Sequence, residues 1–292
     1  MKNILTVDVE EWFHPEALQN RFPREVWDDQ PARVEPLIDL LLDLFARHQA
    51  RATFFVLGWV ADKNPQIVKK IIDAGHEIAS HSLNHRMVTR MTPEEFREDL
   101  SASIKILQDL SGRPVRGFRA PTFSIVERNL WAFDVIAEAG LQYDSSIYPI
   151  WHDRYGIPHA PRRPFAVDTK SGKKIVEFPM PTLRILKKNI PFGGGGYLRL
   201  LPLWFTIMGI KKFNKEGSPA IIYMHPWEFD VHQPRVKLSK LQSIRHYGRI
   251  NQNPGKLAAL LKKFNWMAME DYLKEITEKE KLPVKKLNIR EK

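Results

Sequence analysis

Segments with the pattern of buried strands alternate with helical segments along most of this chain, and this alternation constrains its fold most strongly. The strand-like segments are 4–9, 52–58, 77–81, 115–120, 141–147, 174–180 and 220–225. The helical segments are 34–48, 65–76, 92–112, 127–140, 201–210 and 254–264, and a final strand and helix are expected over 266–276. Such repeated units are typical of an α/β fold with much parallel sheet, so we expect one barrel-like domain over residues 1–275. Residues 148–165 are expected to form a long ordered loop, and 276–292 a charged tail.

The helix expected over 92–112 has the clearest boundaries. Thr92 and Glu95 have the spacing of a capping box, and Pro93 suits the first helical position. Gly112 is the residue type that ends helices. The sequence therefore predicts both ends of this helix.

Composition narrows the chemistry that the protein can perform. The chain has no cysteine, which excludes disulfides, thiolate metal sites and cysteine nucleophiles. Any metal must therefore be held by His, Asp or Glu. The net charge of +11 suits an acidic partner such as an anionic glycan or a membrane surface, although a solvated basic surface is the favoured interpretation. No nucleic-acid-binding motif accompanies the charge, so we expect no nucleic-acid partner.

The sequence also bears on location. No apolar run reaches the roughly 18 residues that a membrane-spanning helix needs. The apolar run after Lys2 is interrupted by Asp8, too early for a secretory signal. We therefore expect a cytoplasmic protein without a transmembrane segment, with peripheral membrane contact as the alternative.

Polar residues recur at the carboxyl ends of the predicted strands. They are Asp8, His81, Arg119, Asp144 and His225. The carboxyl ends of parallel strands meet at one edge of a barrel-like sheet, where active sites of such folds lie. We therefore expect these five side chains to form one site.

His81 and His85 are four residues apart and would share one face of a helical turn, where they could hold a metal. A third, anionic ligand is needed. Asp8 and Glu10 point to the same side of a strand, so one can bind the metal while the other acts as a base in metal-assisted hydrolysis. Glu10, Glu11 and Asp8 are all candidates for the third ligand. The alternative is a surface turn with two unrelated histidines and solvated acids.

Two further residues would support this chemistry. Arg119 precedes an Ala-Pro pair that holds the backbone extended, and an arginine beside Asp8 would keep that carboxylate ionised. His225 ends a strongly apolar strand, where a histidine is usually a core residue. A partner carboxylate, Asp144, would raise its pKa and make it a competent acid.

Aromatic residues and a glycine run could contact a sugar. Trp151, Tyr155, Tyr197 and Trp227 could stack on sugar rings, although core packing explains at least half of them. Gly193–Gly196 either lets the backbone approach a ligand or forms a turn.

The motifs TVDVEE, HSLNH, RAPTFS, YDSS and MHPWE occur in the order and spacing of a known family. From about Ile4 to Glu270 the chain resembles the NodB-type polysaccharide deacetylases of carbohydrate esterase family four. The phrases PFGGGGYLRLLP and YMHPWEFD resemble a narrower group associated with bacterial exopolysaccharide gene clusters and exosortase systems.

This resemblance implies a distorted (β/α) barrel that uses a divalent metal, commonly zinc, to remove N-acetyl groups from amino sugars. It places Asp8 as the general base and His81 and His85 as ligands. Arg119 would orient Asp8. His225 would protonate the leaving amine, with Asp144 tuning it.

The chain departs from the usual pair of adjacent aspartates, because Val9 follows Asp8. It is similar instead to allantoinase-like and peptidoglycan-deacetylase-like members with an Asp-x-acid motif, which makes Glu10 the metal-binding acid. A backbone N–H near Tyr148 or the DSS turn would hold the oxyanion. The expected substrate-contacting residues are Pro121, Tyr148, Trp151, Gly195, Tyr197 and Trp227.

The expected substrate is a polysaccharide or its anionic or lipid-linked precursor, since the long loop and the basic surface suit an extended glycan. Two alternatives remain open. One is an allantoinase-like amidohydrolase acting on a small cyclic or linear amide. The other is a non-catalytic glycan-binding relative.

Overall fold

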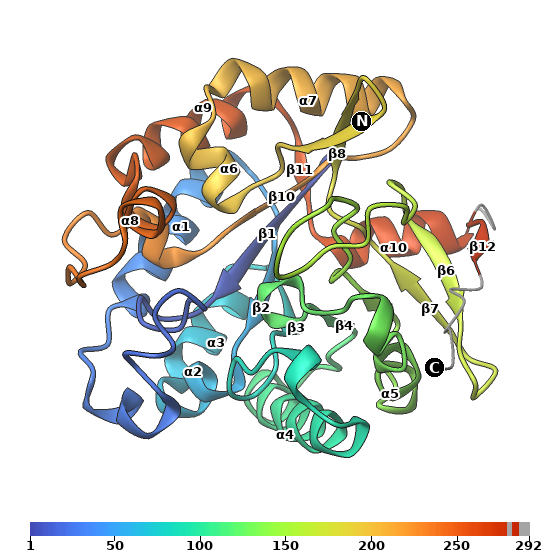
Figure 1. The fold of residues 1–292 in the computed structure, drawn as a ribbon, viewed down its shortest axis with the longest axis horizontal. Coiled ribbons are helices and arrows are strands. Elements are labelled where there is room, and N and C mark those ends of the chain that lie inside the picture. The colour runs from blue at the N-terminus through green and yellow to red at the C-terminus, as the bar shows by residue number, and fades with distance from the viewer. Residues whose placement is uncertain (279–281, 286–292) are drawn as a thin grey trace.

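The computed structural model describes residues 1–278 and 282–285 and has an α/β architecture in which helices surround one large sheet (Figure 1). Its strand order is β10-β1-β2-β3-β4-β5-β7-β6-β12, and β11 also pairs with β1. These strands are β1 (Asn3–Val9), β2 (Thr53–Val56), β3 (Glu77–Ser80), β4 (Gly117–Phe118), β5 (Tyr143–Asp144), β6 (Phe165–Asp168), β7 (Lys174–Glu177), β10 (Ile221–Met224), β11 (Trp266–Met267) and β12 (Val284–Lys285). A separate hairpin consists of β8 (Thr182–Ile185) and β9 (Lys188–Pro191).

The helices pack around this sheet. The α-helices are α1 (Val34–Arg47), α2 (Gly58–Lys63), α3 (Pro65–Asp73), α4 (Pro93–Ser111), α5 (Ala132–Glu138), α6 (Gly195–Leu200), α7 (Leu203–Lys215), α8 (Lys240–Tyr247), α9 (Asn253–Lys263) and α10 (Met269–Glu278). The 3₁₀-helices are η1 (Arg24–Asp29), η2 (Val88–Arg90), η3 (Pro121–Phe123), η4 (Glu127–Asn129), η5 (Pro226–Phe229) and η6 (Ile250–Gln252).

Neighbouring strands of the large sheet are parallel, except that β6 runs antiparallel to β7. Within the described residues, β10 and β12 form the two ends of the strand order and do not pair with each other. The sheet is therefore a half-barrel, and the predicted α/β barrel is confirmed in this distorted, open form.

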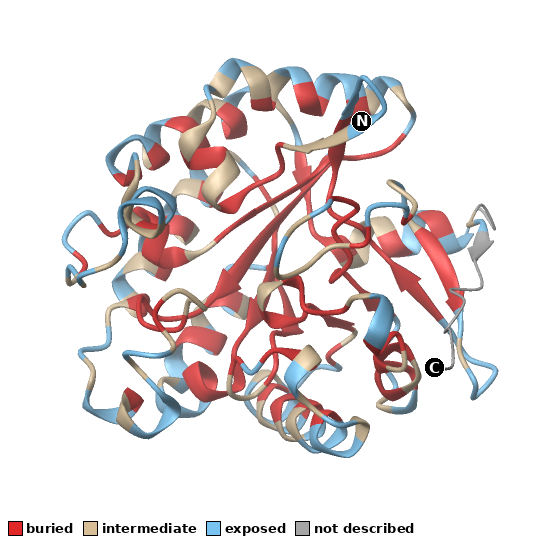
Figure 2. Cartoon of the chain, in the orientation of Figure 1, coloured by how far each residue is buried: buried red, intermediate tan, exposed pale blue. Residues whose placement is uncertain are grey.

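Burial explains why these segments fold as they do. Every residue of β1, β2 and β3 is buried, as expected for parallel strands covered on both faces. Helix α1 turns its apolar stripe inward and leaves its polar face exposed, a pattern that recurs on the outer helices in Figure 2.

Both predicted ends of α4 are confirmed. The Thr92 side chain accepts a hydrogen bond from the Glu95 N–H, and the Glu95 carboxylate accepts one from the Thr92 N–H. Gly112 ends the helix in the left-handed conformation.

Several elements were not predicted from the sequence, namely α2, β6, the β8–β9 hairpin, α6, α8 and β12. The hairpin turn shows why. Leu186 and Lys187 both have positive φ, 46° and 65°, in a turn where Asn-Gly is the usual signal. This turn therefore lacks the residues by which such hairpins are recognised.

The predicted charged tail, 276–292, begins too early. Helix α10 continues to Glu278, and β12 pairs with β6 in parallel register. Residues 279–281 and 286–292 lie outside the described part of the chain.

The glycine run packs against β10. Gly193 accepts a hydrogen bond from the Tyr223 N–H at 2.8 Å, and Gly194 pairs with Tyr223. A Cβ atom on Gly194 would lie 2.0 Å from the Tyr223 carbonyl oxygen. Absence of a side chain is thus needed here for backbone packing.

Among the residues that the structure describes, no helix combines the length and apolar character needed to cross a bilayer.

Candidate active site

The five polar residues predicted at strand ends do lie there. Asp8 is the penultimate residue of β1 and Asp144 is the last of β5, whereas His81, Arg119 and His225 directly follow β3, β4 and β10. Three of these residues line a cavity of about 180 Å³ at the carboxyl edge of the sheet. The residues lining it are Asp8, Glu10, Pro15, Glu16, His81, His85, Ala120, Thr122, Phe123, Tyr155, Tyr223, His225 and Trp227.

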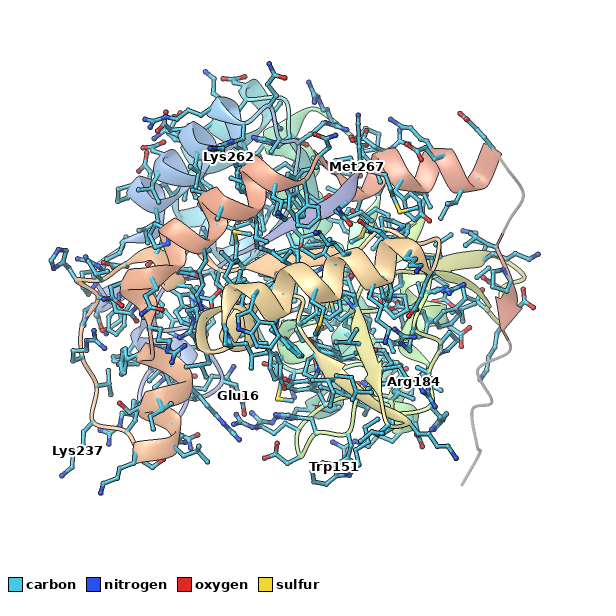
Figure 3. The ribbon with its side chains drawn as sticks, turned by 90° about the horizontal axis from the view of Figure 1, so that it is seen from above. Glu16, Trp151, Arg184, Lys237, Lys262 and Met267 are labelled. Carbon is cyan, nitrogen blue, oxygen red and sulfur yellow. The ribbon has the colours of Figure 1, made fainter. Side chains whose placement is uncertain are left out.

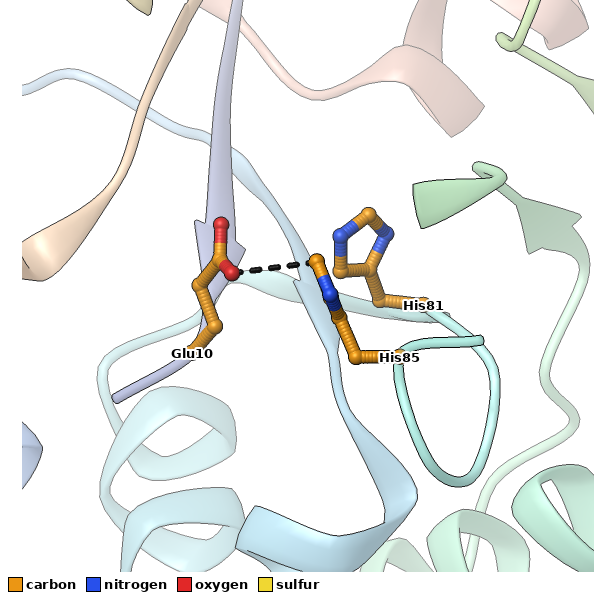
Figure 4. Close-up of side chains that lie close together, drawn as sticks. All are labelled: Glu10, His81 and His85. Atoms are coloured by element: carbon orange, nitrogen blue, oxygen red, sulfur yellow. Dashed lines mark ion pairs between the residues drawn. The ribbon is translucent and has the colours of Figure 1, made fainter. Parts of the chain in front are cut away.

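Glu10, His81 and His85 form a compact group of potential metal ligands (Figure 4). One donor atom from each lies within 4.8 Å of the others, and all three side chains are buried. Glu10 Oε2 lies 3.0 Å from His85 Nε2. Two imidazoles and a carboxylate are a common donor set of catalytic zinc sites.

A loop, and not a helical turn, brings the two histidines together, so that part of the prediction was wrong. Ser82 and His85 adopt positive φ, and the His85 N–H donates to Ser82 Oγ at 3.1 Å. The Asp99 carboxylate accepts hydrogen bonds from the N–H groups of Leu83 and Asn84. These contacts fix the loop without helical structure.

The state of His81 suits a ligand. Its Nδ1 lies 2.8 Å from the carbonyl oxygen of Arg119, which fixes the ring and leaves Nε2 for a cation. Burial and the neighbouring His85 lower the pKa of His81 to about 3, so the ring is neutral. Burial would raise the pKa of Glu10, but the charges of His85 and His225 outweigh it and lower that pKa. The residues present therefore fit a divalent cation.

Glu11 has a different position. Its carboxylate accepts hydrogen bonds from the N–H groups of Arg33 and Val34, at the amino end of α1. A carboxylate at this position accepts from N–H groups that have no partner within the helix. Its negative charge also interacts favourably with the positive amino end of the helix dipole. Of the candidates for the third ligand, Glu10 is the one that lies with both histidines.

Arg119 contacts Asp8, as expected from the sequence. Its Nη1 donates to Asp8 Oδ1 at 2.7 Å and to Thr6 Oγ1 at 2.9 Å. Its Nε and Nη2 donate to the carbonyl and hydroxyl of Ser145, and the Phe55 ring lies 4.2 Å from its guanidinium carbon. The fully buried guanidinium is therefore fixed, and one Asp8 oxygen with it.

His225 faces two carboxylates across the cavity. Its Nε2 lies 3.1 Å from Glu10 Oε1 and 3.8 Å from Asp8 Oδ2. Its Nδ1 lies 3.2 Å from Glu228 Oε2, off the line of a good hydrogen bond. Burial lowers the pKa of His225, but Glu10, Glu228 and Asp8 together raise it to about 9. The ring is therefore an imidazolium at neutral pH.

The predicted contact between Asp144 and His225 is absent, and Glu228 takes its place. Glu228 is held by Arg199, whose Nε lies 2.7 Å from its Oε1. Arg199 and His225 offset the effect of burial on Glu228 and lower its pKa to about 2. Neither Glu228 nor Arg199 was predicted. The spacing His-Pro-Trp-Glu, with an acid three residues after His225, was the available signal.

Asp144 instead supports the neighbourhood of Arg119. Its carboxylate accepts from the N–H and hydroxyl of Ser146, and it shares a fully buried environment with Glu177. Burial raises the pKa of both carboxyls, and mutual repulsion raises that of Glu177 further. Ser146 Oγ accepts from the Ala120 N–H, so Asp144 fixes the backbone next to Arg119.

The comparison with protein families agrees with this site. Residues 26–143 match the polysaccharide deacetylase family, and residues 145–274 match a domain of unknown function, DUF3473. Over residues 26–143 the chain is therefore similar to the polysaccharide deacetylases, and this match covers less than half of its length.

Curated relatives match about a third of the chain. A peptidoglycan-N-acetylglucosamine deacetylase of Bacillus cereus is 37% identical over 93 residues, which are 32% of this chain and 34% of the relative. A chitooligosaccharide deacetylase of Bradyrhizobium sp. is 29% identical over 105 residues, which are 35% of this chain and 45% of the relative. The chain therefore matches less than half the length of these relatives.

Solved structures share the fold across nearly the whole chain. A Mycobacterium smegmatis protein assigned to the polysaccharide deacetylases superposes with a TM-score of 0.64 at 19% identity, covering 100% of this chain and 96% of that one. Puue allantoinase superposes with a TM-score of 0.60 at 18% identity, covering 95% and 91%. At these identities the likeness describes the fold alone.

The two matched segments contribute different walls of the cavity. Of the lining residues, His81 and His85 lie in the segment matching the deacetylase family, whereas His225 and Trp227 lie in the domain of unknown function. The second segment therefore supplies part of the candidate active site.

Of the six expected substrate-contacting residues, only Trp227 lines the cavity. It stacks between His225 and His246, with ring centroids 5.1 and 4.6 Å away. Pro121 is buried in η3, where the neighbouring Ala120, Thr122 and Phe123 reach the cavity instead.

The other expected contacts lie outside the cavity. Tyr148 is fully buried and packs on Tyr155 and Tyr197, and Gly195 packs on the Tyr223 hydroxyl. Trp151 is exposed and lines a separate surface groove.

The expected oxyanion donors of the DSS turn are already engaged. The Ser145 N–H donates to the Phe118 carbonyl, the Ser146 N–H to Asp144, and the Ile147 N–H to Glu177. This turn therefore holds the sheet and the buried carboxyls together.

Proposed function

We propose that this protein removes N-acetyl groups from amino sugars of a glycan, with a divalent metal held by Glu10, His81 and His85. The observation that carries the proposal is the placement of this triad in one small cavity with Asp8 and His225. Together they provide a metal site, a base and an acid. A zinc ion is the proposed metal, because two imidazoles and one carboxylate leave coordination open for a reacting group.

A divalent cation bound there would act as a Lewis acid towards the amide carbonyl and would make water a better nucleophile at neutral pH. The residues of the chain perform the remaining work. The buried imidazoles and the hydrogen bond from His81 to the Arg119 carbonyl hold the ligand geometry in advance.

Asp8 is the proposed general base. Arg119 holds its Oδ1, and its Oδ2 is directed towards His225 and the cavity. As water attacks the acetamide carbon, Asp8 accepts the proton that the water loses. The fixed guanidinium prevents Asp8 from turning away from the cavity.

His225 is the proposed general acid. Its raised pKa, about 9, keeps a proton on the ring at neutral pH. It donates this proton to the departing amine, so that acetate and a free amino sugar leave. Glu228, anchored by Arg199, stabilises the imidazolium and restricts its orientation.

The names of the curated relatives support an N-acetylglucosamine-containing glycan as substrate. An exopolysaccharide or its lipid-linked precursor is the more specific proposal, from the resemblance of the glycine-run and MHPWE segments. The cavity has room for a small group such as an acetamide, so the rest of the glycan would lie across its mouth.

The test is acetate release from chitooligosaccharides and from peptidoglycan fragments, by protein stripped with chelator and then reloaded with zinc. We expect release only after reloading, and none from His81→Ala. Hydrolysis of allantoin without acetate release from any glycan would replace the proposal with a small-amide hydrolase. If the metal-loaded protein bound a glycan but released no acetate, it would be a non-catalytic glycan-binding protein.

A further inference from the structure

Two exposed ridges, each combining apolar and basic side chains, stand beside the cavity. The first, the hairpin ridge, consists of Trp151 and the β8–β9 turn with Arg184, Ile185, Leu186, Lys187 and Lys188. Leu186 is 92% exposed and Trp151 is 82% exposed. A surface groove of about 740 Å³ brings Trp151 together with Arg184, Lys187 and Lys188.

The conformation of the hairpin turn indicates that Leu186 is not there to assist folding. A β-hairpin turn with two positive φ angles favours Asn and Gly, and other residues adopt it at a cost. A large apolar side chain at such a tip also gains nothing from burial, because it is almost fully exposed to solvent. Contact with something outside the protein explains its presence better.

The second ridge, the α8 ridge, is the outer face of α8 and the segment before it. It comprises Arg235, Lys237, Lys240, Leu241, Ile244 and Arg245. Leu241 is 58% exposed and Ile244 is 57% exposed. The opposite face of α8 is anchored to the cavity wall, since His246 stacks on Trp227. The ridge is therefore held rigidly next to the candidate active site.

Both ridges lie on the same side of the molecule as residues that line the cavity. Figure 3 shows Glu16, a cavity residue, with Trp151 and Lys237 along one side of the molecule. Lys262 and Met267 lie towards the opposite side. His152, next to Trp151, stacks on the cavity residue Tyr155 at 3.9 Å, which ties the hairpin ridge to the cavity rim.

The two stretches of chain that contain the β8–β9 turn and α8 have formal charges of one sign, although the exposed Asp153 lies two residues from Trp151. The sequence has no Asp or Glu between Glu177 and Glu216, and none between Asp230 and Glu270. Both acid-free stretches are rich in Lys and Arg, and they contain the β8–β9 turn and α8. An anionic surface would therefore be attracted to this side of the protein.

We propose that the hairpin ridge and the α8 ridge dock this protein on an anionic lipid bilayer, with the cavity mouth held near the headgroups. Basic side chains bind acidic headgroups, and exposed Trp and Leu side chains insert at the boundary between headgroups and acyl chains. A soluble anionic polymer would explain the lysines and arginines but would leave the exposed apolar tips without a partner.

Co-sedimentation of the full chain with vesicles of phosphatidylcholine, with and without phosphatidylglycerol, tests this proposal. We expect binding only when phosphatidylglycerol is present, and weaker binding at higher salt. The double charge reversal Lys187→Glu with Lys188→Glu should weaken binding about tenfold or more. Leu186→Ser should weaken it without changing its salt dependence.

The chain offers matched controls. Lys262→Glu with Lys263→Glu makes the same change in net charge on two exposed lysines of α9, near the opposite side of the molecule. Leu40→Ser replaces an exposed leucine on the outer face of α1. Neither control should alter vesicle binding. If the hairpin variant and the α9 variant lost vesicle binding equally, the loss would follow from the change in net charge alone, and the proposal would be overturned.

Two other results would also overturn it. Binding of a soluble polyanion that competes with vesicles and is unaffected by Leu186→Ser would make the ridges a polyanion site. Concentration-dependent dimers that are abolished by Leu186→Ser and do not bind vesicles would make them a contact between two copies. Vesicle binding requires neither metal nor acetate release, so its failure is distinct from failure of the proposed deacetylation.

Discussion

Glu10 is the side chain that joins the two parts of the candidate active site. Its Oε2 lies 3.0 Å from His85 in the metal triad, whereas its Oε1 lies 3.1 Å from His225. One carboxylate thus contacts both a proposed ligand and the proposed acid. The longer arm of glutamate allows this, because Glu10 lies beyond the end of β1.

Asp8→Asn should abolish most activity while leaving the metal site intact. The amide keeps the size of the side chain but cannot accept the proton of the attacking water. We expect the rate of acetate release to fall roughly 10²–10⁴-fold, with unchanged metal content per chain. Acetate release and elemental analysis check this outcome. A variant that retains the wild-type rate would remove Asp8 as the base.

His81→Ala should remove the metal, because it deletes one of three ligands. His76→Ala provides the matched control, since His76 lies just before β3 and His81 just after it. Metal content per chain should fall in the first variant and stay unchanged in the second, with thermal unfolding recorded for both. Equal metal in the two variants would contradict the triad.

Sequence reasoning identified Asp8, His81, Arg119 and His225 because polar residues stand out at the ends of apolar strands. It failed where more than one acid could be the partner of the same histidine. Asp144 and Glu228 are both acids near a strand end, and only the folded chain shows that Glu228 reaches His225.

At the scale of single elements, the amino end of β3 contains a buried acid far from the candidate active site. Glu77 accepts hydrogen bonds from the Thr53 and Tyr143 hydroxyls and from the Glu270 N–H. Burial, with the Glu270 charge, raises the pKa of Glu77 from 4.5 to about 7, despite these donors. The folded protein therefore retains this proton more strongly than the unfolded chain does.

Glu77 should make the protein less stable as the pH rises. Between about pH 4.5 and 7 the folded state binds more protons than the unfolded state. The stabilisation that protonated Glu77 contributes is therefore complete below pH 4.5 and is lost as the pH rises through about 7. Glu77→Gln, which mimics the protonated acid, should lack this loss. Urea unfolding at pH 5 and pH 8 should show the wild type losing roughly 3 kcal/mol relative to the variant. A difference between the two proteins that is independent of pH would contradict the raised pKa.

Helix α4 gives a second prediction at this scale. Thr92→Ala removes the side-chain acceptor of the capping box, and should lower the free energy of unfolding by about 1 kcal/mol. Denaturant unfolding measures this loss. Activity should not change, because the cap is exposed and neither Thr92 nor Glu95 lines the cavity; a loss of activity equal to that of Asp8→Asn would contradict this.

Elements with strong local signals were predictable, and α4 is the clearest example. The β8–β9 hairpin and α8 were not, because their surfaces are exposed and their patterns mix apolar with basic residues. Their positions are set by tertiary contacts such as the stacking of His246 on Trp227. The half-barrel could be predicted as a class from the strand–helix alternation, but not its open edge.

At the scale of the whole molecule, the two family-matched segments form one sheet. β1 precedes both segments and lies between β2 of the first and β10 of the second. β5 of the first segment likewise pairs with β7 of the second. Both segments therefore contribute strands to the one large sheet, and the β8–β9 hairpin is a small separate sheet of the second segment.

This continuity predicts a single cooperative unfolding unit. Backbone amides of β1, β2 and β10 should exchange with the same free energy, since releasing β10 exposes the buried edge of β1. Hydrogen exchange measured by mass spectrometry over a denaturant series would show this. Exchange of β10 well before β1 would indicate two separate units.

The buried pair of Arg199 and Glu228 has a consequence for exchanging segments between relatives. Arg199 also donates to the carbonyls of Arg245 and Gly248, so α6, η5 and the end of α8 are fitted around one guanidinium. A chimaera that takes only α6 or only η5 from a protein without this pair would bury a carboxylate or a guanidinium without its counterpart. One that takes only the end of α8 would displace two carbonyls that accept from the guanidinium. These three segments must therefore be exchanged together, as one unit that holds the proposed general acid, His225, in place.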